Sequence, residues 1–527
     1  MGRVYFPQYR RGREGIEAFE GTLLDHAREL GVEIASECGG AGTCGRCVVR
    51  IEKGAEALGV STAAERERSL GPNERLACQA SVVRPEHSIH VFIRDFGDYS
   101  IVSDTLETHV ELDPVVRRVG DRAVHADAGD LGPYQGKIYG LAIDAGTTTV
   151  VTEVLDLESG ESLATLARKN PQIAYGNDVI SRIAYTMGRE GGLEELQQGI
   201  VKGVNESLAD LGRRNGSVGE YIYDVVVVGN STMRGIFFGQ DVSTLGMIPF
   251  EPVSLESVAG KAADLGLTVN PACRAYGGPL IGGHAGADPV ADILACGMHV
   301  DDDITMIIDI GTNGEVAIGN RERIMTASCA AGGAYEGATT KCGVGAIEGA
   351  IKNVRILDGR VEFDTIGGKP PVGICGSGLI DLLAEMLRSG VMTEKAKIKD
   401  EFHLTDEISI NQQDIYQLIT AKAGLRADQD LLMQYYGVGI DDISKLHLAG
   451  GFGNFINPES AVAIGLLPNA AEKAVRVGNA ALAGARAMLL SRAMRLTGEK
   501  VAAGIEHAKP NELEPDFAYL VAEKMYF

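Results

Sequence analysis

The sequence contains no apolar run close to the roughly 20 residues that a membrane-spanning helix needs. Its first residues, MGRVYFPQYRRGREG, are basic but are not followed by the apolar segment of a secretory signal, and the myristoylation pattern is absent. Low-complexity tracts are absent as well. The composition, 45% hydrophobic and 23% charged, is that of a globular protein, and 527 residues allow about two to four domains.

Positive charge is scarce. The chain has 49 Lys and Arg against 72 Asp and Glu, which gives a formal net charge of -23 and a pI near 4.9. Because nucleic acids and anionic membrane surfaces are bound mainly through Lys and Arg, this balance argues against both kinds of partner. An acidic surface favours solubility and docking to a partner with basic patches.

Cysteine is also sparse, with nine residues in the chain. The low and odd number argues against a disulfide scaffold and predicts a reduced protein in the cytoplasm. Four of the cysteines are nevertheless grouped. Cys38, Cys44 and Cys47 have the spacing C-x5-C-x2-C in the stretch SECGGAGTCGRC, and Cys78 follows in RLACQA.

Four interpretations of this group are available. Zinc sites favour two C-x2-C pairs, whereas Cys78 stands alone. A redox pair of Cys44 and Cys47 would leave Cys38 and Cys78 unexplained, and four unrelated buried cysteines would not account for the glycines of the loop. A [2Fe-2S] cluster accounts for all of these features, because plant-type clusters use C-x4-C-x2-C with a distant fourth cysteine and glycines let the loop wrap closely. The sequence therefore predicts that Cys38, Cys44, Cys47 and Cys78 bind a [2Fe-2S] cluster.

The residues around the loop favour the same interpretation. Glu20–Ile34 has the apolar periodicity of a helix, and CVVRIEKG (47–54) and IHVFI (89–93) are typical of strands. This order resembles the β-grasp fold of [2Fe-2S] ferredoxins over residues 1–96, and the C-x5-C-x2-C spacing is similar to that of the adrenodoxin-like branch. Residues 97–136 are predicted to be an acidic linker, since nine Asp or Glu and no Lys occur from Asp95 to Asp130.

Two hairpins of similar construction follow the predicted linker. LAIDAGTTTVVTEVLD begins at Leu141 and MIIDIGTNGEVAIG begins at Met306. Each is an apolar strand that runs through D-x-G-T into a second apolar strand, and two copies predict a duplicated domain. Glycine lets backbone N–H groups approach phosphate, threonine adds hydroxyl donors, and aspartate holds Mg²⁺ through its waters. The hairpins therefore predict an ATP and Mg²⁺ site formed by Asp144, Gly146, Thr147, Thr148, Asp309, Gly311, Thr312 and Asn313. The alternative is that the aspartates only cap turns.

A third glycine-rich stretch, KLHLAGGFGNFINP (445–458), lacks the G-K-[ST] of a Walker A loop. With the two hairpins, VVVVGNSTM (225–233) and VGNAALAGARAML (477–489), it resembles the motif order of the actin, hexokinase and heat-shock ATPase superfamily. The resemblance implies an α/β multi-domain protein whose residues 137–527 form a duplicated, two-lobed actin-like ATPase of ribonuclease H-like fold. It also implies that Asp144 or Asp309 orients the attacking water and that adenosine packs against Gly450, Gly451 and Gly453.

Two further glycine-rich runs, Cys329–Gly349 and Gly373–Leu387, lead into predicted helices. Their N-termini are candidates for phosphate contacts, but a role as tight connections within the lobes fits them equally. The remaining cysteines show no C-x2-C spacing and are predicted to be small buried residues.

A ferredoxin fused to such an ATPase resembles the reductive activators of corrinoid proteins, which serve cobalt-dependent methyltransferase systems. NPQIAYGNDVISRI, ICGSGLID and LAGGFGN are similar to stretches of that family. The resemblance implies an ATP-hydrolysing electron-transfer activase that converts Co(II) to Co(I) in a corrinoid protein partner, supplied by an upstream low-potential electron donor. It leaves homodimer formation open. Longer members carry an additional middle domain before the first hairpin, and the short interval between Cys78 and Asp144 leaves little room for one.

Three other functions are compatible with parts of the pattern. One is a small-molecule kinase with a redox-sensing ferredoxin, because the ATPase fold does not fix the activity. Another is an activator of 2-hydroxyacyl-CoA dehydratases, which the C-x5-C-x2-C loop disfavours because that family holds a [4Fe-4S] cluster between subunits. The third is a non-catalytic, ATP-gated iron–sulfur scaffold.

Overall fold

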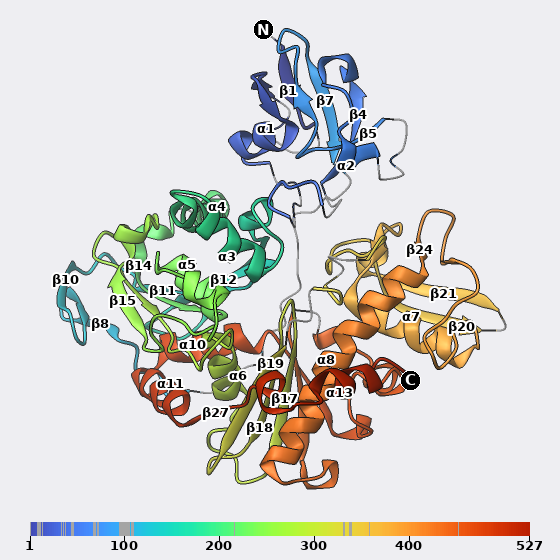
Figure 1. Cartoon of the computed structure of the whole chain (residues 1–527). Coiled ribbons are helices and arrows are strands. Elements are labelled where there is room, and N and C mark those ends of the chain that lie inside the picture. The colour runs from blue at the N-terminus through green and yellow to red at the C-terminus, as the bar shows by residue number, and fades with distance from the viewer. Residues whose placement is uncertain are drawn as a thin grey trace. The chain divides into compact units, whose positions relative to one another are not determined.

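The computed structural model describes residues 2–7, 12, 14–32, 34, 36, 38–43, 47–66, 70, 73–93, 106, 110–215, 217–329, 333–336, 340–357, 359–451 and 453–527. Figure 1 shows their helices and strands. The chain divides into two compact units. The first contains residues 1–98 and 170–200, and the second contains residues 99–169 and 201–527.

The N-terminal part of the first unit is a five-stranded sheet with a helix beside it (Figure 1). β1 pairs in parallel with β7, and the other neighbouring strands are antiparallel. This is the predicted β-grasp ferredoxin fold, with strands at both predicted positions. In sheet order the strands are β2 (Ile16–Glu17), β1 (Arg3–Tyr5), β7 (Ile89–Ile93), β4 (Val48–Lys53) and β5 (Glu74–Leu76); the other elements are β3 (Gly21–Thr22), β6 (Ser81–Val82), α1 (Leu23–Leu30) and α2 (Ala63–Arg66).

Helix α1 leads into the cysteine loop, and both of its ends are defined by local chemistry. Thr22 and Asp25 form a capping box at the N-terminus, in which each side chain bonds to the other residue's backbone N–H. Gly31 ends the helix with φ 64°, in the left-handed region that glycine occupies without strain. Leu23, Leu24 and Ala27 are buried in the core of this sheet, which fixes where the chain leaves toward Cys38.

The rest of the first unit is helical. It consists of the 3-10 turn η3 (Pro171–Ala174), α3 (Val179–Gly188) and the beginning of α4 (Gly192–Asn215). Asn170 caps η3 through its side chain and Asp178 caps α3. Arg182 is fully buried in α3, where its guanidinium donates to the carbonyl of Gly176 and to the side chain of Gln172.

The second unit contains two six-stranded sheets of the same internal plan (Figure 1). Each begins with three consecutive antiparallel strands, and a later strand lies parallel beside the first of them. The duplication predicted from the hairpins is therefore present in the topology. The first sheet has the order β13 (Ser162–Lys169), β12 (Thr149–Asp156), β11 (Tyr139–Ala145), β14 (Ile222–Val228), β16 (Arg274–Gly277), β15 (Val258–Lys261).

The second sheet runs β26 (Ala474–Gly478), β25 (Lys445–Ala449), β17 (Thr305–Ile310), β18 (Gly314–Gly319), β19 (Ile324–Cys329), β27 (Glu506–His507). Strands β11 and β17 are almost continuously apolar and buried, as expected for strands covered on both faces. Each of them ends one residue after the aspartate of its D-x-G-T motif, so that the polar ends of the two hairpins are available for a common site.

Helices α6 (Ala287–Cys296) and α10 (Ala480–Leu490) pack against each other. A Cβ at Gly484 of α10 would overlap the carbonyl oxygen of Ala291 in α6. Glycine therefore permits the close approach of the two helices.

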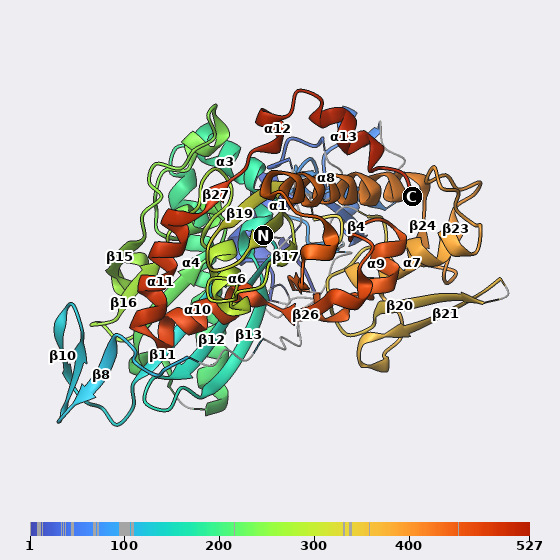
Figure 2. The same ribbon diagram turned by 90° about the horizontal axis from the view of Figure 1, so that it is seen from below.

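Among the remaining elements, the long helix α8 packs against β18 and β19 of the second sheet, and α7 packs against β20 (Figure 2). The side chains of α8 contribute to the largest apolar core, which also contains residues of β17, β18 and α7. These elements are α5 (Ser231–Phe237), α7 (Gly376–Arg388), α8 (Gln412–Tyr436), α9 (Pro458–Ala463), α11 (Arg492–Gly504), α12 (Pro510–Leu513), α13 (Phe517–Glu523), β20 (Ala350–Leu357), β21 (Arg360–Thr365), β22 (Gly373–Ile374), β23 (Phe402–His403) and β24 (Ser409–Ile410).

Part of the predicted acidic linker is folded. Strands β8 (Val116–Val119), β9 (Arg122–His125) and β10 (Gly129–Pro133) form a three-stranded antiparallel sheet. Val116 and Ala123 of this sheet are buried in the core of the first lobe. The strands are short and mostly polar, so the density of charge in the sequence concealed them. Residues 97–105 and 107–109 of the linker lie outside the described residues.

Candidate functional site

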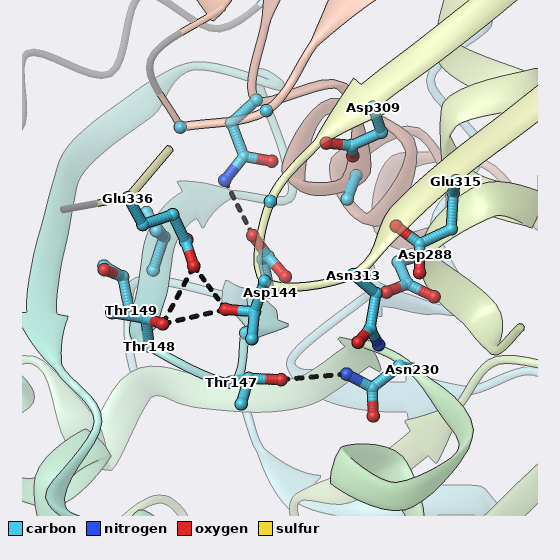
Figure 3. A pocket seen from close by; sticks show the side chains of 18 of the residues that line it. Asp144, Thr147, Thr148, Thr149, Asn230, Asp288, Asp309, Asn313, Glu315 and Glu336 are labelled. Carbon is cyan, nitrogen blue, oxygen red and sulfur yellow. Dashed lines mark hydrogen bonds between the residues drawn. The ribbon is translucent and has the colours of Figure 1, made fainter. Parts of the chain in front are cut away.

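The two D-x-G-T hairpins and the third glycine-rich stretch line one pocket of the second unit (Figure 3). All the residues predicted for ATP and Mg²⁺ border it except Gly453, which begins a 3-10 turn behind the loop. Residues that sequence reasoning missed also line it, and most of them are polar. The pocket is bordered by Asp144, Gly146, Thr147, Thr148, Thr149, Val151, Asn230, Asp288, Asp309, Gly311, Thr312, Asn313, Glu315, Glu336, Gly450, Gly451, Asn454, Gly478, Asn479 and Ala481.

The first hairpin presents Asp144 at the end of β11. Asn479 donates from Nδ2 to Oδ2 of Asp144 at 2.7 Å, while its own Oδ1 accepts from the backbone N–H of Leu482 and caps α10. Burial raises the pKa of Asp144 to about 6, against the opposing effect of the Asn479 bond. One asparagine thus connects the first hairpin to the connecting segment that the sequence predicts at 477–489.

The same hairpin is fixed on its other side by Asn230, which follows β14. Its Nδ2 donates to Oγ1 of Thr147 at 3.0 Å, and its Oδ1 accepts from the N–H of Met233 to cap α5. Both predicted connecting segments therefore contribute an asparagine that caps a helix and bonds to the first hairpin.

The second hairpin presents Asp309 close to the predicted adenosine stretch. Gly450 has φ 108°, and a Cβ there would lie 2.5 Å from the carbonyl oxygen of Ile310 and 2.8 Å from Oδ1 of Asp309. A glycine is thus required where β25 ends beside β17. Burial, followed by the charge of Asp144, raises the pKa of Asp309 to about 7.

Three further carboxylates surround Asp309 and were not predicted. Asp288 and Asp292 lie one turn apart on α6, and Glu315 is paired with Asp309 across the hairpin. Burial raises the pKa of all three well above the ordinary range, and neighbouring carboxylates add to the effect. The i,i+4 spacing of the aspartates in HAGADPVAD and the cross-strand register of Glu315 were the signals available in the sequence.

A hydroxyl from each hairpin meets Glu336 (Figure 3). Oγ1 of Thr148 lies 2.8 Å from Oγ1 of Thr312, and both hydroxyls bond to Oε2 of Glu336, Thr148 at 3.0 Å. Burial raises the pKa of Glu336, while these two bonds lower it. Glu336 belongs to the glycine-rich run 329–349, whose role the sequence left open, and no spacing there singles it out.

The carboxylates of the pocket, with the neighbouring Asp292, fit a divalent cation with a nucleotide. Oδ1 of Asp288, Oδ1 of Asp292 and Oε1 of Glu315 are buried without a hydrogen-bond partner in the described part of the chain. Such acceptors are costly unless a cation or its waters satisfy them. No group of three or more His, Cys, Asp or Glu among the described residues converges to hold a metal directly.

Three of the four predicted cluster cysteines lie among the described residues of the first unit. Cys47 and Cys78 are buried, and the Cys47 thiol donates to Sγ of Cys78 at 3.2 Å. The separation is far longer than the S–S bond of a disulfide. The hydrogen bond from Cys47 lowers the pKa of Cys78 against the effect of burial. Cys38 is partly buried, and Cys44 lies outside the described residues.

The loop around these sulfurs fits a cluster. Gly39, Gly40 and Gly42 all have positive φ, which turns successive backbone groups through a tight path. Gln79 closes the loop by donating from Nε2 to the carbonyl oxygen of Gly40 at 3.1 Å. Two thiols that face each other beside a glycine-built loop supply two of the four donors that a [2Fe-2S] cluster requires.

The fold and these two sites define a class of protein: an iron–sulfur ferredoxin joined to a duplicated, two-lobed ATPase. Residues 12–83 match the 2Fe-2S iron–sulfur cluster binding domain, residues 139–301 match the RACo middle region, and residues 303–527 match the C-terminal domain of RACo, the ASKHA domain. The middle region matched here includes the first hairpin, so it is part of the ATPase lobes. The chain belongs to the RACo family, the reductive activators of corrinoid proteins.

Relatives support this membership along nearly the whole chain. The corrinoid activation enzyme RamQ of Eubacterium limosum is 30% identical over 564 aligned residues, which cover 93% of both chains. The [Co(II) methylated amine-specific corrinoid protein] reductase of Methanosarcina barkeri is 27% identical over 67% of this chain and 70% of its own. A solved reductive activator for corrinoid, iron-sulfur protein is 30% identical, with a TM-score of 0.75 over 100% of this chain and 98% of that one.

Among the described residues, no helix combines the length and the apolar character that crossing a membrane requires.

Proposed function

We propose that this protein is an ATP-dependent reductive activator, which transfers one electron to the Co(II) of a corrinoid protein in a methyltransferase system and thereby restores Co(I). One observation carries the proposal: a single chain holds both a facing thiol pair in a ferredoxin fold and a two-hairpin pocket in an ATPase fold. A relative that aligns over 93% of the chain is named for corrinoid activation, and one that aligns over 67% of it is named for corrinoid protein reduction.

The first unit supplies the electron. In this proposal Cys38, Cys44, Cys47 and Cys78 hold a [2Fe-2S] cluster, which when bound takes up and gives out one electron at a time. The glycines at 39, 40 and 42 let the loop approach the sulfurs, and Gln79 holds the loop closed at Gly40. An upstream carrier of low potential supplies each electron.

The second unit supplies the free energy. The two hairpins and Asn313 surround the phosphates, and Gly450 and Gly451 pack against adenosine. Mg²⁺ bound to the phosphates would offset the charge of the surrounding carboxylates. We assign Asp309 or Asp144 to orient the attacking water, because pKa values near 7 and 6 suit a group that accepts a proton close to neutral pH.

ATP is needed because the electron moves uphill. Plant-type clusters have potentials near about -400 mV, and the proposal places the Co(II)/Co(I) couple lower. Each ~59 mV of difference makes a one-electron transfer tenfold less favourable. ATP can reverse this balance only if the corrinoid protein binds differently to the nucleotide states of the ATPase.

The test combines the pre-reduced protein, Mg²⁺-ATP and a Co(II) corrinoid protein of a methyltransferase system, and follows the Co(I) absorption band. Co(I) should form only when ATP is present. Formation without ATP, or no formation with any such corrinoid protein, would refute the proposal. A Cys44→Ala variant should lose transfer and retain ATP binding, and an Asp309→Ala variant should show the reverse loss. Phosphorylation of a sugar or an organic acid without a corrinoid protein would instead identify a kinase.

A further inference from the structure

Glu336 joins the two phosphate hairpins of the ATPase (Figure 3). Its Oε2 accepts hydrogen bonds from the hydroxyl of Thr148 in the first hairpin and of Thr312 in the second. The two hydroxyls are also within hydrogen-bond distance of each other, at 2.8 Å. A single carboxylate oxygen thus accepts a hydrogen bond from each of the two hairpins.

The carboxylate is held in place by the residue before it. Tyr335 is only 2% exposed, and its hydroxyl donates to the carbonyl oxygen of Leu418 in α8 at 3.0 Å. A buried aromatic ring with a satisfied hydroxyl is a firm anchor for the turn at 333–336. The backbone from which the Glu336 side chain extends into the pocket is therefore held in place.

The hydroxyl bonds to Glu336 are incompatible with bonds from the same hydroxyls to phosphate. A threonine hydroxyl has one proton, so it donates to one acceptor at a time. A phosphate that takes both protons must also lie next to the carboxylate, where two negative charges repel each other. Among the lining residues that the structure describes, none is Lys or Arg, so no fixed positive charge of the pocket relieves this repulsion.

We propose that Glu336 is a positioning residue that senses the γ-phosphate: it holds the Thr148 and Thr312 hydroxyls, and a triphosphate must displace its carboxylate to take them. ADP lacks the group that competes with Glu336. Glu336 therefore increases the structural difference between the ATP-bound and the ADP-bound protein at the junction of the two hairpins. The inference rests on the proposed ATP binding, but not on the corrinoid partner.

The experiment is calorimetric titration of the full-length protein with Mg²⁺ and either ADP or a non-hydrolysable ATP analogue. The Glu336→Gln variant keeps the size of the side chain and a hydrogen-bond acceptor but removes the charge. Its Kd for the analogue is expected to fall about tenfold, equivalent to about 1.4 kcal/mol, while its Kd for ADP stays within about twofold. Because only nucleotide binding is measured, failure of corrinoid reduction would not affect the result.

Glu315→Gln is the matched control, since Glu315 is a second buried carboxylate of the pocket with no hydrogen bond to either hydroxyl among the described residues. It should change the two Kd values by similar factors. A selective gain for the analogue in this control would show a general charge effect and overturn the proposal. An unchanged or weaker affinity of Glu336→Gln for the analogue would also overturn it, because a Mg²⁺-bound or catalytic Glu336 predicts a loss.

If Glu336→Gln does not fold, Glu336→Asp tests the same proposal. Its affinity for the analogue should increase about threefold, and a loss of affinity would refute the positioning role of Glu336.

Discussion

Replacing Asp144 by asparagine should stabilise the protein at alkaline pH while removing its function. Burial raises the pKa of Asp144 to about 6 from an ordinary value of 3.8. At about 1.4 kcal/mol for each pH unit, ionising this carboxyl costs the folded protein roughly 3 kcal/mol at pH 8. The amide oxygen of the substituted side chain would still accept the hydrogen bond from Asn479, so little except the charge changes.

The direction of the pH dependence follows from the raised pKa. The folded protein binds a proton at Asp144 more readily than the unfolded chain does. The stabilisation that this bound proton gives the folded protein is complete below the unfolded pKa, near 3.8, and is lost as the pH rises through about 6. The advantage of Asp144→Asn should therefore be small at pH 4, about 0.5 kcal/mol, and complete at pH 8.

Differential scanning calorimetry of the full chain at both pH values measures the effect. The transition to follow is the one that Mg²⁺ and a non-hydrolysable ATP analogue shift upward in the wild-type protein. At pH 8 the variant should melt roughly 5 °C higher and should respond little to the analogue. The exposed Asp303→Asn substitution should change neither transition. A lower melting temperature for Asp144→Asn at pH 8, or a gain of equal size at pH 4, would refute the reasoning.

Three other substitutions test separate parts of the structure. Cys47→Ser removes one of the two facing thiols and should abolish the iron content and the visible absorption of the protein, with nucleotide affinity unchanged in calorimetric titration. Gly450→Ala places a Cβ 2.5 Å from the carbonyl oxygen of Ile310 at φ 108° and should weaken binding of the ATP analogue by about tenfold or more. Arg495→Met leaves the fully buried carboxylate of Asp224 without its ion pair and should cost about 3–5 kcal/mol, seen as a lower melting temperature at pH 8.

Each of these has a contrary outcome. Retained iron in Cys47→Ser would remove that thiol from the cluster, and undiminished nucleotide affinity in Gly450→Ala would mean that β25 and β17 separate without cost. Unchanged melting of Arg495→Met would show that the carboxylate of Asp224 is protonated or reaches water. An additional Asp224→Asn change should recover part of the stability that Arg495→Met loses.

The site residues that could be predicted from the sequence are those that lie in a recognisable local motif. Asp144 and Asp309 were found because each lies in a short motif that occurs twice and joins two apolar strands. Glu315 required one more step: in a hairpin with the turn at Gly311–Asn313, the register pairs it with Asp309. That step is possible from the sequence, because hairpin register follows from the turn.

Other parts depend on contacts that no local pattern encodes. Asp288 reaches the pocket only because α6 lies against β17 and β18, and Glu336 does so because Tyr335 is anchored on α8. The sheet at 116–133 was missed because few of its side chains are buried. The alternation of apolar and polar residues was therefore weak, and the segment was interpreted as a linker because of its charge. Tertiary packing determines these positions, and neither secondary-structure propensity nor hydrophobic periodicity can predict them.

The way in which the lobes meet determines what ATP binding can do. The Thr148–Thr312 contact joins hairpins of two different sheets, and α6 and α10 are packed too closely at Gly484 to deform gradually. We therefore expect a change at the phosphates to move one lobe against the other. If that movement changes the affinity for the corrinoid protein by some factor, the corrinoid protein must change the affinity for the nucleotide by the same factor. The corrinoid protein would then act as an effector of nucleotide binding by the ATPase.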